Sequence, residues 1–201
     1  MARYTGPRTK KSRRYGVALF GPHKALERRN YPPGMHGDKG RRKQSEYATA
    51  LGEKQKLRLM YGLLERQFRK YYETALRRRG VTGETMLQLL ETRLDNVVFR
   101  LGFGNSRRAA RQMVNHGHVN VNGKRVTIPS YRVRKGDVVS LRTKARSMIV
   151  IRHNLDTLER RVPAWLETAA EGAEVSVLDL PQREHIDVPV RESLIVELYS
   201  K

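Results

Sequence analysis

The sequence contains no cysteine, which excludes disulfide bonds and thiolate metal sites. No stretch approaches the roughly 18 consecutive apolar residues that a membrane-spanning helix needs. The basic N-terminus is not followed by the apolar core of a secretory signal, so no such signal is expected. Together these absences favour a cytoplasmic protein.

Acidic residues are also scarce, with 20 Asp and Glu against 41 Lys and Arg, which leaves a net charge of +21. Self-repulsion at this charge is unfavourable for a free enzyme, so a polyanionic partner is expected, with nucleic acid favoured over an anionic membrane surface. The excess is uneven: residues 1–80 carry +16, residues 81–155 carry +10 and residues 156–201 carry −5. The first two regions are therefore expected to contact the polyanion, and the last to pack or to face a basic protein.

The most informative local pattern is a short arginine-rich helix that leads into a tight β-hairpin. Ser106 can cap the helix. Ala110, Met113 and Val114 follow at i, i+3 and i+4, which places them on one buried face. The nearby arginines Arg107, Arg108 and Arg111 fall off that face and are expected to point outward together.

The hairpin is predicted from its turn residues. Asn122-Gly123 supplies the two positive φ angles of a type I′ turn. Strands are expected at 119–121, at 126–128 on the return, and at 138–141. One apolar and one cationic side would result, which suits a phosphate backbone.

The rest of the chain separates by composition. Residues 1–44 contain many Gly and Pro and little periodicity, so they are expected to be a basic extension, either a solvated tail or one that orders on RNA. Residues 45–92 are expected to be helical, with Ser45 as an N-cap and an apolar stripe from Leu57 to Leu76 as core.

Beyond this helical region, residues 93–155 are expected to form an RNA-binding module and residues 156–201 a C-terminal segment that packs back on the helical domain. Short strands are predicted around 148–151, 175–178 and 194–198. The expected fold class is α+β: an extension, an all-α domain, an inserted α/β module with a helix pair packed on a short antiparallel sheet, and the C-terminal segment.

Residues 93–141 resemble the small RNA-binding module shared by ribosomal protein S four, some pseudouridine synthases, heat-shock RNA binders and certain tRNA synthetases. Further blocks are similar to bacterial ribosomal proteins of the S four family and follow the family's order from end to end. These blocks are MARYTGP (1–7), YPPGMHG (31–37), EKQKLRLMYGLLERQF (53–68), VPAWLE (162–167) and IDVPVRESLIVELYSK (186–201).

The resemblance implies a structural protein, not an enzyme, that binds the five-prime domain of small-subunit ribosomal RNA as a primary binder. It implies roles in nucleating subunit assembly and in decoding accuracy. The implied neighbours are ribosomal proteins S five and S three, with messenger RNA near its entry channel. No cofactor, membrane contact or homo-oligomer is expected.

Some members of the family hold zinc through four N-terminal cysteines. Here Thr9 and Ser12 stand at the first two matching positions, and His23 alone cannot replace the metal. The chain is thus expected to be a zinc-less variant in which packing or RNA contacts hold the N-terminal region.

Other classes fit less well. A pseudouridine synthase needs a large catalytic domain, and only about 60 residues follow the module. A stress-type binder of stalled ribosomal subunits would lack the N-terminal blocks. A peripheral membrane protein would need an exposed amphipathic helix, whereas the apolar stripes here are interpreted as core.

Arginine and lysine are the expected RNA contacts, because the guanidinium fork in particular grips phosphate bidentately. In the module they are Arg107, Arg108, Arg111, Lys124, Arg125, Arg132, Arg134 and Lys135. Elsewhere they are Arg3, Lys10, Lys11, Arg13, Arg14, His36, Arg41, Arg42, Lys54, Lys56, Arg58, Arg66, Arg69 and Lys70.

Overall fold

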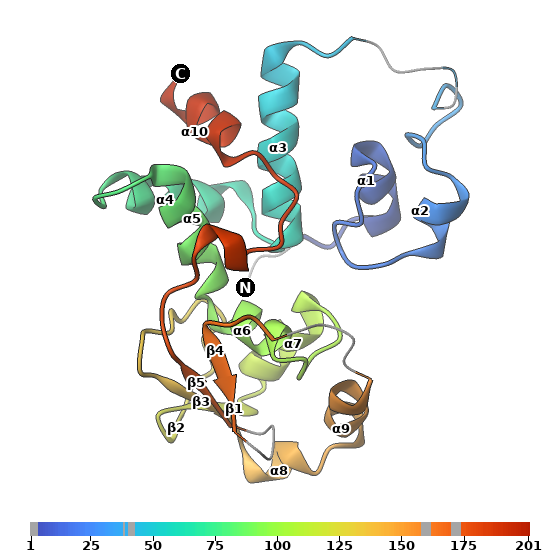
Figure 1. The fold of residues 1–201 in the computed structure, drawn as a ribbon. Coiled ribbons are helices and arrows are strands. Elements are labelled where there is room, and N and C mark those ends of the chain that lie inside the picture. The colour runs from blue at the N-terminus through green and yellow to red at the C-terminus, as the bar shows by residue number, and fades with distance from the viewer. Residues whose placement is uncertain (1–3, 38, 40–42, 158–161, 170–173) are drawn as a thin grey trace. The chain divides into compact units, whose positions relative to one another are not determined.

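The computed structural model describes residues 4–37, 39, 43–157, 162–169 and 174–201. It divides into two compact units, which we call the first unit (residues 1–83 and 188–201) and the second unit (residues 84–187). Helices and a small antiparallel sheet occur in the described residues, which confirms the α+β class (Figure 1). None of the described helices has the length and apolar character needed to cross a membrane.

The first unit is helical. Its helices are α1 (Arg8–Tyr15), α2 (Lys24–Arg28), α3 (Glu46–Met60), α4 (Glu65–Leu76) and α10 (Glu192–Ser200). The hydroxyl of Ser45 accepts the amide of Ala48 at 3.2 Å, so the predicted N-cap of α3 is confirmed. Gly62, at φ 63°, follows the end of α3, so the predicted apolar stripe is divided between α3 and α4.

The last helix, α10, packs on α3 and reaches α4. The ring of Tyr199 stacks on Tyr72 at 4.7 Å between centroids and lies 6.3 Å from Phe68. The strand predicted at 194–198 is therefore wrong. A short apolar run fits either a strand or a buried helix face, and here Ile195 is fully buried on a helix.

The N-terminal region also differs from expectation, because α1 and α2 form within residues expected to lack periodic structure. The guanidinium of Arg13 donates through Nε to the carbonyls of Arg29 and Tyr31, at 3.1 and 3.2 Å, and lies 4.8 Å from the Tyr31 ring centroid. Oγ1 of Thr9 and Nε2 of His23 lie 3.1 Å apart. Hydrogen bonds between α1 and the chain that follows thus hold this region.

The same contacts show that this region does not fit a zinc ion. Thr9 and Ser12 offer hydroxyls where structural zinc sites use thiolates or imidazoles, Ser12 is buried, and the His23 ring is already paired with Thr9.

The second unit begins within α5 (Thr82–Glu91) and contains α6 (Leu94–Arg100), α7 (Arg107–Asn115), α8 (Thr143–Arg146), α9 (Ile149–Asp156) and the short 3-10 helix η1 (Arg183–His185). Its strands are β1 (Val119–Val121), β2 (Lys124–Arg125), β3 (Val138–Leu141), β4 (Leu166–Thr168) and β5 (Glu174–Val177), in the antiparallel order β2-β1-β3-β5-β4.

The β1–β2 hairpin turns at Asn122 and Gly123, whose φ angles of 50° and 75° confirm the predicted turn. The return strand β2 is shorter and earlier than predicted. Pairing ends at Lys124–Arg125, and Ile128 is 57% exposed instead of lying in a strand. Residues 129–133 leave the sheet and hydrogen-bond to the start of α6 instead, through Leu94 N to Tyr131 O at 2.8 Å.

The C-terminal segment is divided between the two units. β4 and β5 extend the sheet of the second unit, because β5 pairs with β3 and β4 pairs with β5. Only the part from Val188 onward joins the helical first unit. Residues 149–151, expected in a strand, begin helix α9, where Ile151 is buried while Ile149 and Val150 face solvent.

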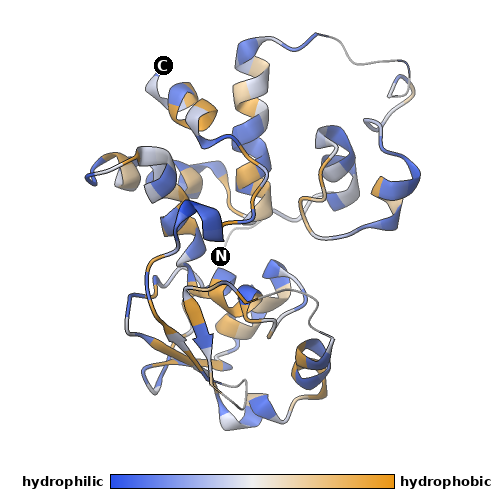
Figure 2. Cartoon of the chain, in the orientation of Figure 1, coloured by the Kyte–Doolittle hydropathy of each residue, from blue (hydrophilic) through white to orange (hydrophobic). Residues whose placement is uncertain are grey.

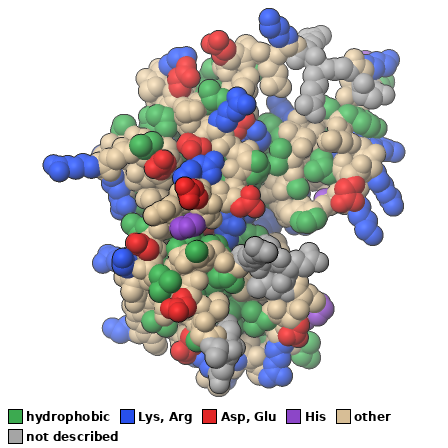
Figure 3. All heavy atoms as spheres, viewed as in Figure 1, with side chains coloured by type: hydrophobic (Ala, Val, Ile, Leu, Met, Phe, Trp, Pro, Cys, Tyr) green, Lys and Arg blue, Asp and Glu red, His purple; other side chains and the backbone are tan. Residues whose placement is uncertain are grey.

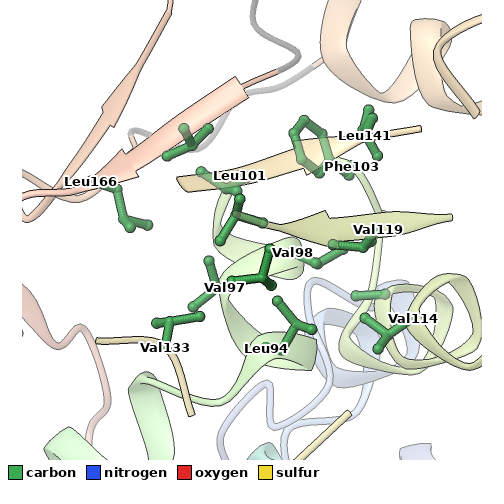
Figure 4. Close-up of a cluster of buried hydrophobic side chains, with 14 of the residues drawn as sticks. Leu94, Val97, Val98, Leu101, Phe103, Val114, Val119, Val133, Leu141 and Leu166 are labelled. Atoms are coloured by element: carbon green, nitrogen blue, oxygen red, sulfur yellow. The ribbon is translucent and has the colours of Figure 1, made fainter. Parts of the chain in front are cut away.

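The core of the second unit lies between α6, α7 and the sheet (Figure 4). Val97 and Val98 of α6 lie among Val114 of α7, Val119 of β1 and Leu141 of β3, all nearly inaccessible. Figure 2 shows this apolar layer on the strands and on α6. Burial of each such side chain contributes about 1.5–3 kcal/mol, which fixes α7 and the hairpin against one another.

Candidate nucleic-acid interface

The end of α7 and the β1–β2 hairpin bring four basic side chains together. Gly117 follows α7 at φ 72°, and a Cβ at this position would stand 2.2 Å from Nε of Arg125. Nη1 of Arg142 also reaches the carbonyl of Gly117, at 3.4 Å. The rings of His116 and His118 lie 6.0 Å apart. We call this group, His116, His118, Arg125 and Arg142, the hairpin cation cluster.

Electrostatics within the cluster are repulsive. Partial burial, together with the neighbouring charges of His116, Arg142 and Arg125, holds the pKa of His118 below its ordinary value of 6.5. A bound anion would offset the repulsion between these positive charges. The glycine at position 117 permits the close approach of Arg125, because any side chain there would collide with the guanidinium.

Two of the predicted contacts, Arg107 and Arg108, occupy the first turn of α7, which contains no acidic residue. Nε of Arg107 donates to Oδ1 of Asn96 at 2.8 Å, and its guanidinium lies 4.5 Å from the Phe99 ring centroid. Both arginines are half-buried. The N-terminal end of α7 carries these two cations next to the positive end of the helix dipole, where a phosphate group would be stabilised by both.

The prediction that Arg111 points outward with them is wrong. Arg111 is 8% exposed, and its Nε donates to Oδ2 of Asp95 at 2.8 Å. Asp95 also accepts from Nη2 of Arg93 at 2.7 Å. Asp95 lies on α6, which packs against α7, so the charge of Arg111 is directed into the helix pair.

A second buried network supports the start of α6. Glu91 accepts from Nη2 of Arg100 at 2.8 Å and from Nδ2 of Asn96 at 2.7 Å. Because Asn96 in turn holds Arg107, the position of that arginine is set from α5 through α6. The sequence does not reveal this series of hydrogen bonds, because its members are 5 to 11 residues apart on separate helices.

The remaining predicted module contacts lie on loops and the edge strand. Lys124, Arg125, Arg134 and Lys135 are exposed, whereas Arg132 is half-buried and its backbone bridges to Arg93. Figure 3 shows that lysine and arginine side chains project from the surface of both units, with acidic side chains among them. Arg142, which is not among the contacts predicted from the sequence, joins the cluster because β3, the strand before it, pairs with β1.

In the first unit the predicted residues have different environments. Lys10 and Arg14 are exposed and Lys11 is half-buried on α1, while Arg66, Arg69 and Lys70 are exposed on α4. Arg13 is turned inward to the carbonyls described above.

The expected basic face of α3 is largely neutralised within the protein. Lys54 is 9% exposed and donates to Glu65 at 2.7 Å, and Lys56 pairs with Glu53 at 2.5 Å. Arg58 is held by Gln55. These lysines are therefore not free surface charges, in contrast to the expectation. His36 is exposed, and the predicted contacts Arg3, Arg41 and Arg42 lie outside the described residues.

The described residues contain no group of three or more His, Asp or Glu side chains arranged to hold a metal ion. The hairpin cation cluster and the first turn of α7 place basic side chains on a folded helix and hairpin. This arrangement is suited to holding a phosphate backbone.

Comparison with known proteins identifies the family. The model described as "Ribosomal protein S4/S9 N-terminal domain" matches residues 3–91, and the model described as "S4 domain", an RNA-binding module, matches residues 92–139. Proteins named "Small ribosomal subunit protein uS4" from Nocardioides, Akkermansia muciniphila and Thermus thermophilus are 58%, 56% and 51% identical, each over the full length of both chains. Such names describe structural ribosomal proteins, which are not enzymes. In agreement with the resemblance seen in its sequence, the chain belongs to the uS4 family of small ribosomal subunit proteins.

Proposed function

We propose that the chain is a structural, RNA-binding component of the small ribosomal subunit and a primary binder of the five-prime domain of its ribosomal RNA. The observation that carries this proposal is the hairpin cation cluster, which lies at and just beyond the residues that match the S4 domain. The ribosome is a cytoplasmic particle in bacteria, so the site of action is the cytoplasm.

Recognition of folded RNA of this kind is mainly recognition of shape and backbone. The cluster supplies two guanidinium groups and two imidazoles on a folded support, because the amide of Gly117 bonds to the end of α7 and the hairpin pairs with β3 through β1. Arg107 and Arg108, at the other end of α7, would contact a second phosphate of the same RNA.

The test is binding of the purified chain to five-prime domain RNA and to bulk tRNA at two salt concentrations. Tight, selective binding that weakens steeply with salt is expected, because each neutralised phosphate releases condensed counterions. The double variant Arg125→Gln, Arg142→Gln, which removes both guanidinium groups of the cluster, is expected to bind at least tenfold more weakly, with a shallower salt slope. Lys201→Gln is the matched control, since it removes a lysine paired with Glu197 in the acidic C-terminal region. Equal affinity for both RNAs would contradict the proposal.

We further propose that early binding by this chain nucleates subunit assembly and supports decoding accuracy, beside ribosomal proteins S five and S three and near the messenger RNA entry channel. The family resemblance supports this proposal. Exposed acidic residues of the C-terminal part, Glu184 and Asp187 among them, would face the neighbours. Zero-length carbodiimide cross-linking in reconstituted subunits should join these carboxylates to lysines of S five or S three. Cross-links only to other proteins would exclude that placement.

A further inference from the structure

The first unit contains a cavity of about 470 Å³ between α1 and α3. Lys11, Arg14 and Tyr15 line it from α1. Gln44 lines it from the segment before α3, and Gln55 and Arg58 line it from α3 itself. This volume lies within the range of small-molecule and cofactor sites. The cavity is separate from the hairpin cation cluster, which belongs to the second unit.

The cavity is cationic. Lys11, Arg14 and Arg58 contribute three positive charges, and no carboxylate occurs among the described residues that line it. Nη2 of Arg58 donates to Oε1 of Gln55, but its buried Nε has no hydrogen-bond acceptor among the described residues, with the nearest carboxylate oxygen of Glu65 at 3.8 Å. The cavity wall therefore holds a buried donor and a charge excess that an anion would satisfy.

Tyr15 gives the cavity a flat aromatic wall. The guanidinium of Arg14 lies 5.8 Å from the centre of its ring. Burial raises the pKa of Tyr15 in spite of the charges of Arg14 and Arg58, so the phenol keeps its proton at neutral pH. An aromatic face beside cations is the arrangement that proteins use to stack an unpaired base while its phosphate is held.

Gly52 lies opposite this ring on α3. A Cβ at that position would contact Cε1 of Tyr15 at 3.8 Å, which is an ordinary van der Waals distance. The space in front of Tyr15 is therefore open because residue 52 has no side chain. The amides of Gln44 and Gln55 at the wall can both donate and accept, as reading the edge of a base requires.

We propose that this cavity binds a single unpaired nucleotide of RNA, with its phosphate on Lys11 and Arg14 and its base against Tyr15. This proposal deepens the proposed function and rests on it for the identity of the RNA. An acidic peptide would satisfy the cations, but it would leave the aromatic wall and the amides unused.

The decisive variant is Gly52→Leu, which places an apolar side chain in the cavity and leaves every charge in place. Gly52→Ala is the matched control, because its methyl group is accommodated and alanine also favours the helix. Gly52→Leu is expected to weaken binding to five-prime domain RNA at least tenfold, while Gly52→Ala binds as the unchanged chain does. Equal binding by both variants would overturn the proposal. If Gly52→Leu fails to fold by circular dichroism, Tyr15→Leu takes its place with the same expectation.

A second measurement separates this site from the proposed function. Amide NMR shifts of residues 11–15 and 52 are followed while a mixed-sequence single-stranded hexaribonucleotide is added to the full chain, with an RNA duplex and poly-glutamate as comparisons. Shifts with the single strand alone support the site, even if binding to the five-prime domain fails and the proposed function with it. Absence of shifts, or equal shifts with poly-glutamate, would overturn the nucleotide assignment even where five-prime domain binding is tight.

Discussion

Asp95 is the shared acceptor of a buried ion-pair network between α6 and α7. Its carboxylate is 4% exposed and accepts hydrogen bonds from both Arg93 and Arg111, which are themselves buried. A buried carboxylate between two guanidinium groups offsets the cost of removing three charges from water. Loss of the central charge leaves two buried cations without a counterion.

Asp95→Asn is therefore expected to lower the free energy of unfolding by about 3–5 kcal/mol, measured by urea denaturation. Glu73→Gln is the control, because its pair with Arg69 is exposed and its loss should cost less than about 0.5 kcal/mol. If the two variants prove equally stable, the buried network does not have the energetic role assigned to it.

His118 allows a test of the hairpin cation cluster by titration. Its pKa in the folded chain is below 6.5, because burial, His116, Arg142 and Arg125 all disfavour the imidazolium. The folded state thus binds the imidazolium proton of His118 less well than the unfolded state does. Relative to the protonated ring, neutral His118 favours folding above pH 6.5, and this stabilisation is lost as the pH falls through the folded pKa.

Arg142→Gln is expected to raise the pKa of His118, as followed by NMR of the imidazole. Bound five-prime domain RNA should raise it further in the unchanged chain, because a phosphate favours the charged ring. RNA binding should accordingly strengthen as the pH falls below 7. A pKa of His118 that is the same with and without RNA would show that no phosphate approaches the cluster.

Much of this residue-level picture was accessible from the sequence, but not all of it. The caps at Ser45 and Ser106 and the turn at Asn122-Gly123 are local, and each was predicted because its chemistry needs only adjacent residues. Whether Arg111 faces RNA or Asp95 depends on how α6 lies against α7. That packing is tertiary, and no helical spacing within α7 reveals it.

At the scale of elements, α3, α4 and α10 are joined by a small polar cluster within an apolar setting. Glu65 accepts from Nζ of Lys54 and from the hydroxyl of Tyr199, both at 2.7 Å. Burial alone would raise the pKa of Glu65, but these two hydrogen bonds and the charge of Arg58 hold it below its ordinary value of 4.5. For Tyr199, burial and the neighbouring carboxylate raise the pKa.

Folding lowers the pKa of Glu65. The ionised side chain therefore contributes its full stabilisation of the folded state above about pH 4.5, and this stabilisation is lost as the pH falls through the folded pKa. Glu65→Gln is expected to cost roughly 1–2 kcal/mol at pH 7, a modest amount because the Glu65 side chain is 44% exposed. Its effect should disappear in acid, as measured by denaturation between pH 7 and pH 3.

Tyr199→Phe should cost about 1 kcal/mol, and the double variant less than the sum. Full additivity would show that the two side chains do not act on one another.

The elements that the sequence did not reveal share a physical reason. Helix α10 and the start of α9 are short apolar runs, for which periodicity does not distinguish strand from helix. Helix α1 buries only Ser12 and therefore has no apolar stripe. Its boundaries were nonetheless visible, because Pro7 precedes it and Gly16 follows it at φ 64°. The return strand was expected at 126–128 because its valine and isoleucine suit strands, but residues 129–133 bond to α6.

At the scale of the whole molecule, charge and fold follow different divisions of the chain. The acidic excess begins at residue 156, whereas the second unit continues to residue 187. Composition therefore placed residues 156–201 together, although β4 and β5 complete the sheet of the module and only α10 and the segment before it complete the helical unit. Strand pairing between β3 and β5 joins residues about 35 apart, a distance over which sequence patterns say nothing of register.

This division leads to a prediction about which part of the chain folds alone. A fragment of residues 84–187 contains α5 to η1, all five described strands, and the whole apolar cluster from Leu94 to Val177, including the buried Trp165. It should fold and unfold cooperatively in urea, because its core and its sheet are both complete.

The matched fragment is residues 93–155, which the sequence alone would select as the module. It lacks Glu91, which holds Arg100 and Asn96, and it leaves β3 as an unpaired edge with Val139 and Leu141 deprived of Val175 and Trp165. The shorter fragment should therefore be largely unfolded by circular dichroism and by amide hydrogen exchange. Equal stability of the two fragments would mean that β4 and β5 are an accessory layer, and that the core of the module closes without them.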